Sequence, residues 1–157
     1  MGVITSALTK LYILGVADAA IANQADYEGL TAVEVGEIED MGGFGDEANI
    51  VTFTALNNRR VRKLKGSFDG GNMELQLGRD LTDLGQAALK AAQAADDDYG
   101  FKVTFNDEGT GSPSSPTTVY FRAKVTSFTT SPGNADSILA AAATLAITSE
   151  FLEIAAV

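Results

Sequence analysis

The sequence predicts a mainly β protein with antiparallel strands and one flanking α-helix. Three observations lead to this fold class. Segments in which apolar and polar residues alternate, the period of half-buried strands, recur along most of the chain. The clearest, 119–126, leads to a turn at 131–134 and a second apolar segment at 138–147, as in a long β-hairpin. Only the segment that begins at Asp80 carries apolar residues at helical spacing.

Composition narrows the classes of function. The 157 residues suit a single domain (1–157), and 21 acidic against 11 basic residues give a net charge of −10. Because affinity for nucleic acid comes mainly from lysine and arginine side chains that contact phosphates, a chain with this net charge is a poor candidate for a nucleic-acid-binding protein. There is no cysteine and no histidine, so disulfides, thiolate zinc sites and the commonest general base are absent. We therefore expect no enzymatic role, no metal and no cofactor.

Residues 1–23 are rich in alanine, threonine and leucine, with a strand expected at 8–14 and a short helical turn at 18–25. Two interpretations are open for this segment: an N-terminal arm that docks onto a neighbouring subunit, or an ordinary edge strand. The apolar run Leu11–Val16 is too short to span a membrane and lacks the pattern of a secretory signal. We expect a soluble protein, made in a cytoplasm, with no membrane partner.

A short strand at 32–38 leads into a glycine-rich segment, which predicts a flexible, exposed loop over 40–49. Its central residues are Met41, Gly42, Gly43, Phe44, Gly45, Asp46 and Glu47. Glycine-rich loops can cradle phosphates, but no Gly-Lys-Ser/Thr follows and the flanking charges are acidic. A phosphate site is therefore excluded, and a surface loop is expected.

The next strand, 49–56, ends in an Asn57–Asn58 turn and is followed by the most uneven charge feature of the chain. Five of the eleven cationic residues of the chain lie within residues 59–65: Arg59, Arg60, Arg62, Lys63 and Lys65. No aromatic residue interleaves them and the overall charge opposes them, so a nucleic-acid site is disfavoured. Two alternatives are open, a solvated strand face or a contact with an acidic surface on an identical copy.

The run Asp69–Asn72 predicts a hairpin turn, and 73–78 predicts a returning strand with Glu74 and Gln76 on its outer side. The helix is expected to begin at Asp80, whose carboxylate caps the free N–H groups. Its apolar stripe is Leu81, Leu84, Ala88, Ala91 and Ala95.

The helix is expected to end at Asp96, Asp97 and Asp98. The spacing of a calcium loop is absent, so a metal site is disfavoured. These acids form either a solvated loop or a partner for the basic run of a neighbouring copy.

A strand at 99–106 and a proline-containing loop at 107–117 lead to the long hairpin. The alanine run 140–143 favours helix by propensity, whereas the β-branched residues Thr144, Ile147 and Thr148 and the preceding turn favour strand. We predict a strand over 138–147, with helix as the alternative.

Several segments in this order resemble the major tail tube proteins of long-tailed, siphovirus-type bacteriophages. They are Leu77-Gly78-Arg79-Asp80 leading into Gln86–Leu89, Ala123–Phe128, Pro132-Gly133, Asp136–Ile138 and Leu145–Thr148. The resemblance spans residues 34–151.

The resemblance implies an antiparallel β-sandwich flanked by a helix, whose copies form hexameric rings that stack into a tube. One sheet of each subunit would line the channel, and the tube would be a conduit for the genome during ejection. It also implies a place in the virion tail, assembly in the host cytoplasm, and contacts with tape measure, tail terminator and tail tip proteins. DNA would be only a passing cargo.

By this resemblance, residues 40–49 would reach the adjacent ring, and the basic run would pair with Asp96–Asp98 of a neighbour. The channel would be lined by Glu74 and Gln76, or by Thr144 and Thr148. The alternative function is a monomeric β-sandwich module that binds carbohydrate or protein.

Overall fold

The computed structural model describes residues 2–157, so residue 1 of the predicted arm lies outside the described residues. The mainly β, antiparallel fold class is confirmed. The strands are β1 (Lys10–Val16), β2 (Val33–Val35), β3 (Ile38–Asp40), β4 (Glu47–Phe53), β5 (Arg62–Asp69), β6 (Asn72–Gly78), β7 (Tyr99–Thr104), β8 (Thr118–Ser131), β9 (Ala140–Ile147) and β10 (Leu152–Ile154). The helices are α1 (Gln24–Glu28) and α2 (Leu84–Ala94).

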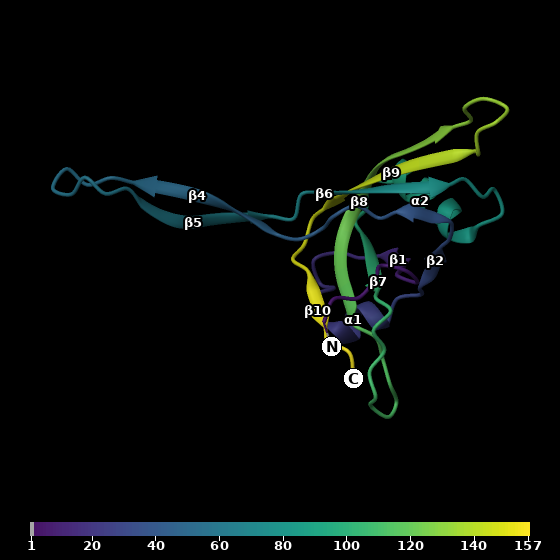
Figure 1. Ribbon diagram of the computed structural model, residues 1–157, viewed down its shortest axis with the longest axis horizontal. Helices are drawn as coiled ribbons and strands as arrows, with labels where there is room; N and C mark the ends of the chain where they lie inside the picture. The colour runs from purple at the N-terminus through teal and green to yellow at the C-terminus, as the bar shows by residue number, and fades with distance from the viewer. Residues whose placement is uncertain (1) are drawn as a thin grey trace.

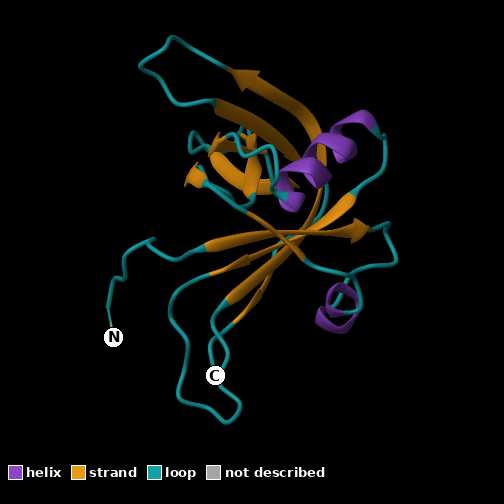
Figure 2. Cartoon of the chain, turned by 90° about the vertical axis from the view of Figure 1, so that its right-hand side faces the viewer, coloured by secondary structure: helices purple, strands orange, loops and turns teal. Residues whose placement is uncertain are grey.

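Strand β8 organises the main sheet, whose strand order is β2-β1-β7-β8-β9-β6-β3 (Figure 1). The first half of β8 pairs with β7 and the second half pairs with β9, with a register shift between Val125 and Ser127. The short strand β10 continues along β8 beyond the end of β9, opposite residues 118–120. Figure 2 shows the strands in two groups that form the layers of a sandwich, and the pairing of β8 with both β7 and β9 makes it the strand that the two layers share.

Both halves of the sheet contribute to one core. Phe101 and Phe121 stack with ring centroids 5.6 Å apart, and both are fully buried. Leu75 and Leu145 join them from β6 and β9, and Leu89 joins from α2. Fully burying a side chain of this size contributes about 1.5–3 kcal/mol. The core therefore holds the two layers and the helix together.

The predicted long hairpin is confirmed, and the alanine run is a strand. Ala141 and Ala143 point into the core, opposite Leu77 and Leu75 of β6. Strand β9 lies between β6 and β8 and pairs with both. Hydrogen bonding on two sides outweighs the helix propensity of alanine, which differs from that of ordinary residues by less than about 1 kcal/mol per residue.

The start and the buried face of the predicted helix were wrong. Helix α2 begins at Leu84, and the carboxylate of Asp83 caps it by accepting from the Gln86 N–H at 2.9 Å. The carboxylate of Asp80 instead accepts from Thr82 in the preceding turn. Leu81 and Leu84 were predicted to be buried, but 75% and 76% of their surface is exposed.

The residues of α2 that are buried are Gly85, Gln86, Leu89 and Ala92. Sequence reasoning missed this face because the stripe was counted from Asp80. Gln86 is the one fully buried polar residue within 2–157. Because it is polar, a search for apolar residues at helical spacing does not place it on the buried face.

The N-terminal segment contains the second helix, α1, which lies at Gln24–Glu28 and so begins later than the short helical turn predicted at 18–25. Asn23 and Asp26 form a capping box at the start of α1, and Tyr27 stacks on Tyr120 with ring centroids 5.2 Å apart. Strand β1 lies between β2 and β7, so the expectation of an edge strand was wrong. Within residues 2–157, neither helix has the length and apolar character needed to cross a membrane.

The predicted hairpin turn at Asp69–Asn72 does not join paired strands. Strand β5 pairs with β4 in a separate two-stranded sheet, whereas β6 pairs with β9 and β3. Gly70 allows the backbone to pass close to β9 as the chain returns to the main sheet, because a Cβ at this position would lie only 2.5 Å from the Ile147 side chain. The β4–β5 hairpin therefore projects away from the sandwich (Figure 1).

Candidate assembly surfaces

The β4–β5 hairpin is the largest feature that the sandwich itself does not cover. Its strands pair with each other and with no other strand of residues 2–157. A two-stranded hairpin alone is at best marginally stable in water. Its exposed apolar side chains are Ile50 (57%), Val51 (52%), Phe53 (55%), Leu56 (109%), Val61 (51%), Leu64 (61%) and Phe68 (66%). The alternation over 50–55 predicted a half-buried strand, but within one copy both faces are open.

The register of the hairpin separates two faces. Val51 lies opposite Leu64, and Phe53 lies opposite Arg62, so one face is apolar with a cation near its tip. Ile50 lies opposite Lys65, and Thr52 lies opposite Lys63, so the other face is basic. Cross-strand partners share a face of the ribbon. The hairpin can therefore offer apolar contact on one side and positive charge on the other.

The predicted basic run occupies the tip and second strand of this hairpin. Arg59 and Arg60 follow the tip, where the Asn58 amide oxygen accepts from the N–H of Arg60 at 3.0 Å. The ion pairs within residues 2–157 are formed by Lys10, Arg122 and Lys124, and none includes a hairpin cation. None of the five cations of the hairpin therefore forms an ion pair with a carboxylate among residues 2–157.

The loop predicted at 40–49 is shorter and more firmly packed than expected. Residues 41–46 connect β3 to β4, and Glu47 already belongs to β4. Met41 and Phe44 pack against the core, and the Phe44 ring centroid lies 5.5 Å from that of Phe151. Gly42 has φ +66°, and a Cβ there would lie 2.6 Å from the Glu74 carbonyl oxygen. The projecting element is the hairpin after the loop.

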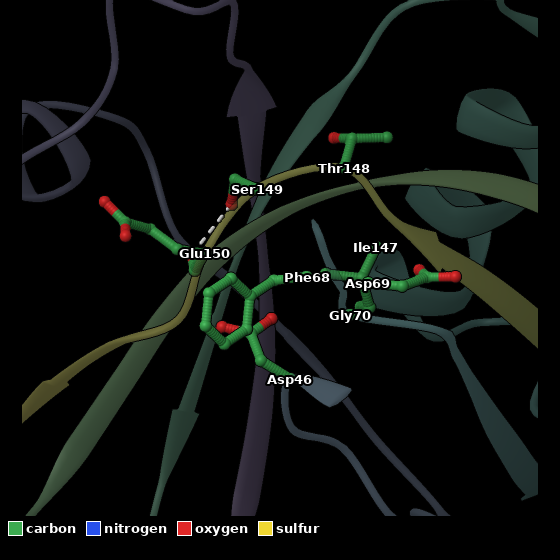
Figure 3. A pocket seen from close by; sticks show the side chains of 8 residues that line it. All are labelled: Asp46, Phe68, Asp69, Gly70, Ile147, Thr148, Ser149 and Glu150. Carbon is green, nitrogen blue, oxygen red and sulfur yellow. Dashed lines mark hydrogen bonds between the residues drawn. The ribbon is translucent and has the colours of Figure 1, made fainter. Parts of the chain in front are cut away.

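A hollow of about 390 Å³ lies at the base of the hairpin (Figure 3). Phe68 and Ile147 line it together with the carboxylates of Asp46, Asp69 and Glu150. Within residues 2–157, no group of three or more acidic side chains is arranged to hold a metal ion. The hollow adds negative charge where the basic hairpin joins the sandwich.

The three acids after α2 differ in their environment. Asp96 and Asp97 are exposed, whereas an oxygen of Asp98 lies 2.8 Å from the Lys124 ammonium. Thr148 donates to the other oxygen at 3.1 Å, and Arg122 lies 4.0 Å from it.

Partial burial raises the pKa of the Asp98 carboxyl. The hydrogen bonds from Lys124 and Thr148 and the positive charges of Lys124 and Arg122 lower this pKa, and their combined effect is larger than that of burial. Its pKa is therefore lower than the ordinary value of 3.8. Asp98 is engaged within its own copy.

The residues predicted to line a channel fall in two places. Glu74 and Thr144 are cross-strand partners on β6 and β9, and Gln76 lies beside them opposite Ala142. They lie on the face of the sheet opposite the core, among small and polar side chains. Thr148 lies beyond the end of β9, where it contacts Asp98. The first three therefore share one surface, and Thr148 does not.

This part of the sheet also has open edges. Strand β7 pairs with β8 only as far as Ala123, so residues 124–131 of β8 have no strand on that side within the described chain. At the other edge, β3 pairs with β6 at Ile38 and Asp40 and has no further neighbour. Both edges carry backbone groups able to pair with another strand.

Comparison with known proteins gives structural likeness only. No protein-family model matches the chain, and no curated protein matches its sequence. Among solved structures, a chain of the anti-feeding prophage baseplate has a TM-score of 0.69 at 12% identity, over 99% of this chain and 98% of that one. A chain of the SPP1 tail tube has a TM-score of 0.64 at 16% identity, over 93% and 77%.

A chain of the sheath-tube complex of an extracellular contractile injection system has a TM-score of 0.62 at 16% identity, over 92% of this chain and 88% of that one. The similar structures thus include contractile systems as well as the SPP1 tail. The chain has the fold found in components of phage tails and phage-like injection systems.

Proposed function

We propose that this protein is the subunit of a tail tube, in which copies close into rings and the rings stack through the β4–β5 hairpin. The observation that carries the proposal is the hairpin itself, whose apolar and basic faces have no partner in their own copy. An apolar surface of this kind marks a contact site. The fold shared with a tail tube chain and a sheath-tube chain supports the same role.

Ring closure would join the open edges of the main sheet. Residues 124–131 of β8 and strand β3 lie at the two edges of the β8-β9-β6-β3 half. Edge-to-edge pairing around a ring leaves no edge exposed, the solution that closed barrels adopt. We propose six copies per ring, in keeping with the six-fold symmetry stated for the anti-feeding prophage baseplate.

The outer face of β6 and β9, which carries Glu74, Gln76 and Thr144, would line the channel. A net charge of −10 on each subunit would repeat around every ring. Phosphates would then meet repulsion instead of binding, since cations supply nucleic-acid affinity. The tube would be a conduit for DNA, placed in the tail of a virion of the long-tailed type. Its further contacts would be tape measure, terminator and tip proteins.

Negative-stain electron microscopy and sedimentation of the concentrated protein test this function. We expect rings or tubes from the natural sequence. A variant in which Asn49–Ser67 is replaced by a two-residue Asn-Gly turn keeps the whole core and is expected to lose stacking. A compact monomer of the natural protein at every concentration would contradict the proposal and favour a monomeric binding module.

A further inference from the structure

A second exposed apolar surface lies around the start of α2 and the start of β9. Three side chains form it, and we call them the acceptor patch: Leu81 (75% exposed), Ile138 (70%) and Leu139 (36%). Leu81, Ile138 and Leu139 line a shallow hollow of about 510 Å³. Several large apolar side chains exposed together indicate a contact site, whereas single ones do not.

The walls of this hollow are fixed by backbone hydrogen bonds. The Arg79 N–H donates to the Leu139 carbonyl at 2.7 Å, and the Gly78 N–H donates to the Glu37 carbonyl at 2.8 Å. The buried Gln86 side chain also accepts from the Asp80 N–H at 3.0 Å. These bonds join three separate chain segments at one place. A rigid surface loses less conformational freedom when another molecule docks on it.

The patch and the hairpin lie at opposite ends of the subunit. In Figure 1, the β4–β5 hairpin forms the left end, whereas the β6–α2 connection and the β8–β9 loop lie at the right. The view places the longest axis of the molecule horizontally, so the separation is real. The two surfaces therefore cannot meet within one copy. A contact between different surfaces of identical copies repeats head to tail, either into a closed ring or along an axis.

The chemistry of the two surfaces is complementary. The hairpin offers Phe53, Leu56 and Leu64 with five cations nearby. The hollow is lined by the three apolar side chains of the patch together with the acidic residues Glu37 and Asp80, and Asp136 is two residues before Ile138.

Arg79 is the one cation among the lining residues that the structure describes. Its guanidinium donates to Gln86 at 3.2 Å and lies 5.2 Å over the Phe128 ring. These two partners orient the guanidinium but are neutral, so the charge of the lining is set by the carboxylates of Glu37 and Asp80, which outnumber the one cation.

We propose that the acceptor patch receives the β4–β5 hairpin of the next copy, and that this contact stacks one ring on another. The inference rests on the proposed tube function and names the surface that the hairpin meets. It assigns the acidic partner of the basic run to Glu37, Asp80 and Asp136, in place of the predicted Asp96–Asp98.

Cysteine cross-linking tests the contact directly, because the chain has no cysteine of its own. The double variant L56C/I138C places one thiol on the hairpin and one in the patch, both at exposed positions where folding is not disturbed. With a short bismaleimide we expect a ladder of covalent oligomers on a denaturing gel. Each single variant has one thiol per copy and can give only a dimer. The matched control L56C/V16C has its second thiol at an exposed position away from the patch.

The outcomes separate the two proposals. A ladder from L56C/I138C but not from L56C/V16C supports the acceptor patch. Tubes in the microscope with no ladder from L56C/I138C, or with an equal ladder from the control, overturn the patch and leave the tube function standing. A ladder without rings or tubes supports the head-to-tail contact and contradicts the tube. Natural protein that neither assembles nor cross-links overturns both.

Discussion

The carboxylate of Asp98 lies 2.8 Å from the ammonium of Lys124, and this ion pair joins the segment between α2 and β7 to the middle of β8. The same ammonium also donates to the Asp96 carbonyl oxygen. Asp96 and Asp98, which flank Asp97, therefore both hold Lys124, Asp98 by its side chain and Asp96 by its backbone carbonyl. The pair therefore fixes the connection between α2 and β7, the strand that pairs with the first half of β8.

Replacing Asp98 with asparagine is expected to lower the free energy of unfolding at pH 7 by about 0.2–1 kcal/mol, the range for solvent-accessible ion pairs. The pKa of Asp98 is depressed when folded, so its contribution is present above 3.8 and is lost as pH falls through the folded value. The D98N and natural curves should therefore converge in acid. Urea unfolding measured across pH 3–7 checks this, with the exposed Asp97→Asn as control. Parallel D98N and natural curves would contradict it.

Gln86 is fully buried and forms four hydrogen bonds that join α2 to the β2–β3 and β6 segments. Its amide nitrogen donates to the carbonyls of Gly36 and Gly78, and its oxygen accepts from Asp80 and Arg79. Gln86→Leu leaves these buried groups unpaired and is expected to cost about 1–3 kcal/mol of unfolding free energy. Gln93→Leu, an exposed change in the same helix, is the control. Equal urea midpoints for the two variants would disprove this role.

The elements that the sequence predicted best are those whose pattern comes from the core of one copy. Strands β6, β7 and β8 alternate because one side of each faces the same apolar interior. The start of α2 was placed too early because Asp80 and Asp83 are both good capping residues. Which of them caps the helix depends on the contact of Asp83 with the Gly36 N–H, 47 residues earlier in the chain. Local sequence carries no sign of such a contact.

The assembly surfaces were harder to predict for a different reason. Residues 50–53 alternate like a half-buried strand, and the core that would bury them is absent from their own copy. The basic run was recognised as unusual, but its position on a projecting hairpin depends on β5 pairing with β4 instead of β6. The acceptor patch was missed because Leu81 was assigned to the buried face of the helix.

Charge reversal on the hairpin is expected to separate folding from assembly. Arg62→Glu with Lys63→Glu alters both faces of an element that packs on no other strand, so the monomer should unfold as before. Rings should no longer stack, because the reversed charges repel the acids of the next copy. Electron microscopy and circular dichroism check the two halves of this expectation. Tubes of normal length would rule out the hairpin as the stacking element.

The two single variants should differ in severity. Arg62 shares its face with Val51, Phe53 and Leu64, whereas Lys63 shares its face with Thr52. If the apolar face is the buried one, Arg62→Glu places an unpaired charge in the contact and should weaken stacking more than Lys63→Glu. Equal loss from both variants would mean that the neighbouring copy covers the two faces alike.

A change of charge in the proposed channel tests where DNA passes. Glu74→Lys with Gln76→Lys alters exposed residues on the outer face of β6 and leaves the core side chains in place. Tubes of this variant are expected to retain short duplex DNA at low salt and to release it as salt rises, because each added lysine displaces counterions from phosphates. Tubes of the natural protein should give no gel shift under the same conditions.

The matched control for this experiment is Asp97→Lys with Gln93→Lys, which adds the same charge at exposed positions at the end of α2 and just after it. If the outer face of β6 lines the channel, DNA held by the Glu74 and Gln76 variant is enclosed by the tube and protected from nuclease, whereas DNA held by the control remains open to digestion. Equal digestion of both would place Glu74 and Gln76 outside the channel, since net charge alone explains binding but cannot explain protection.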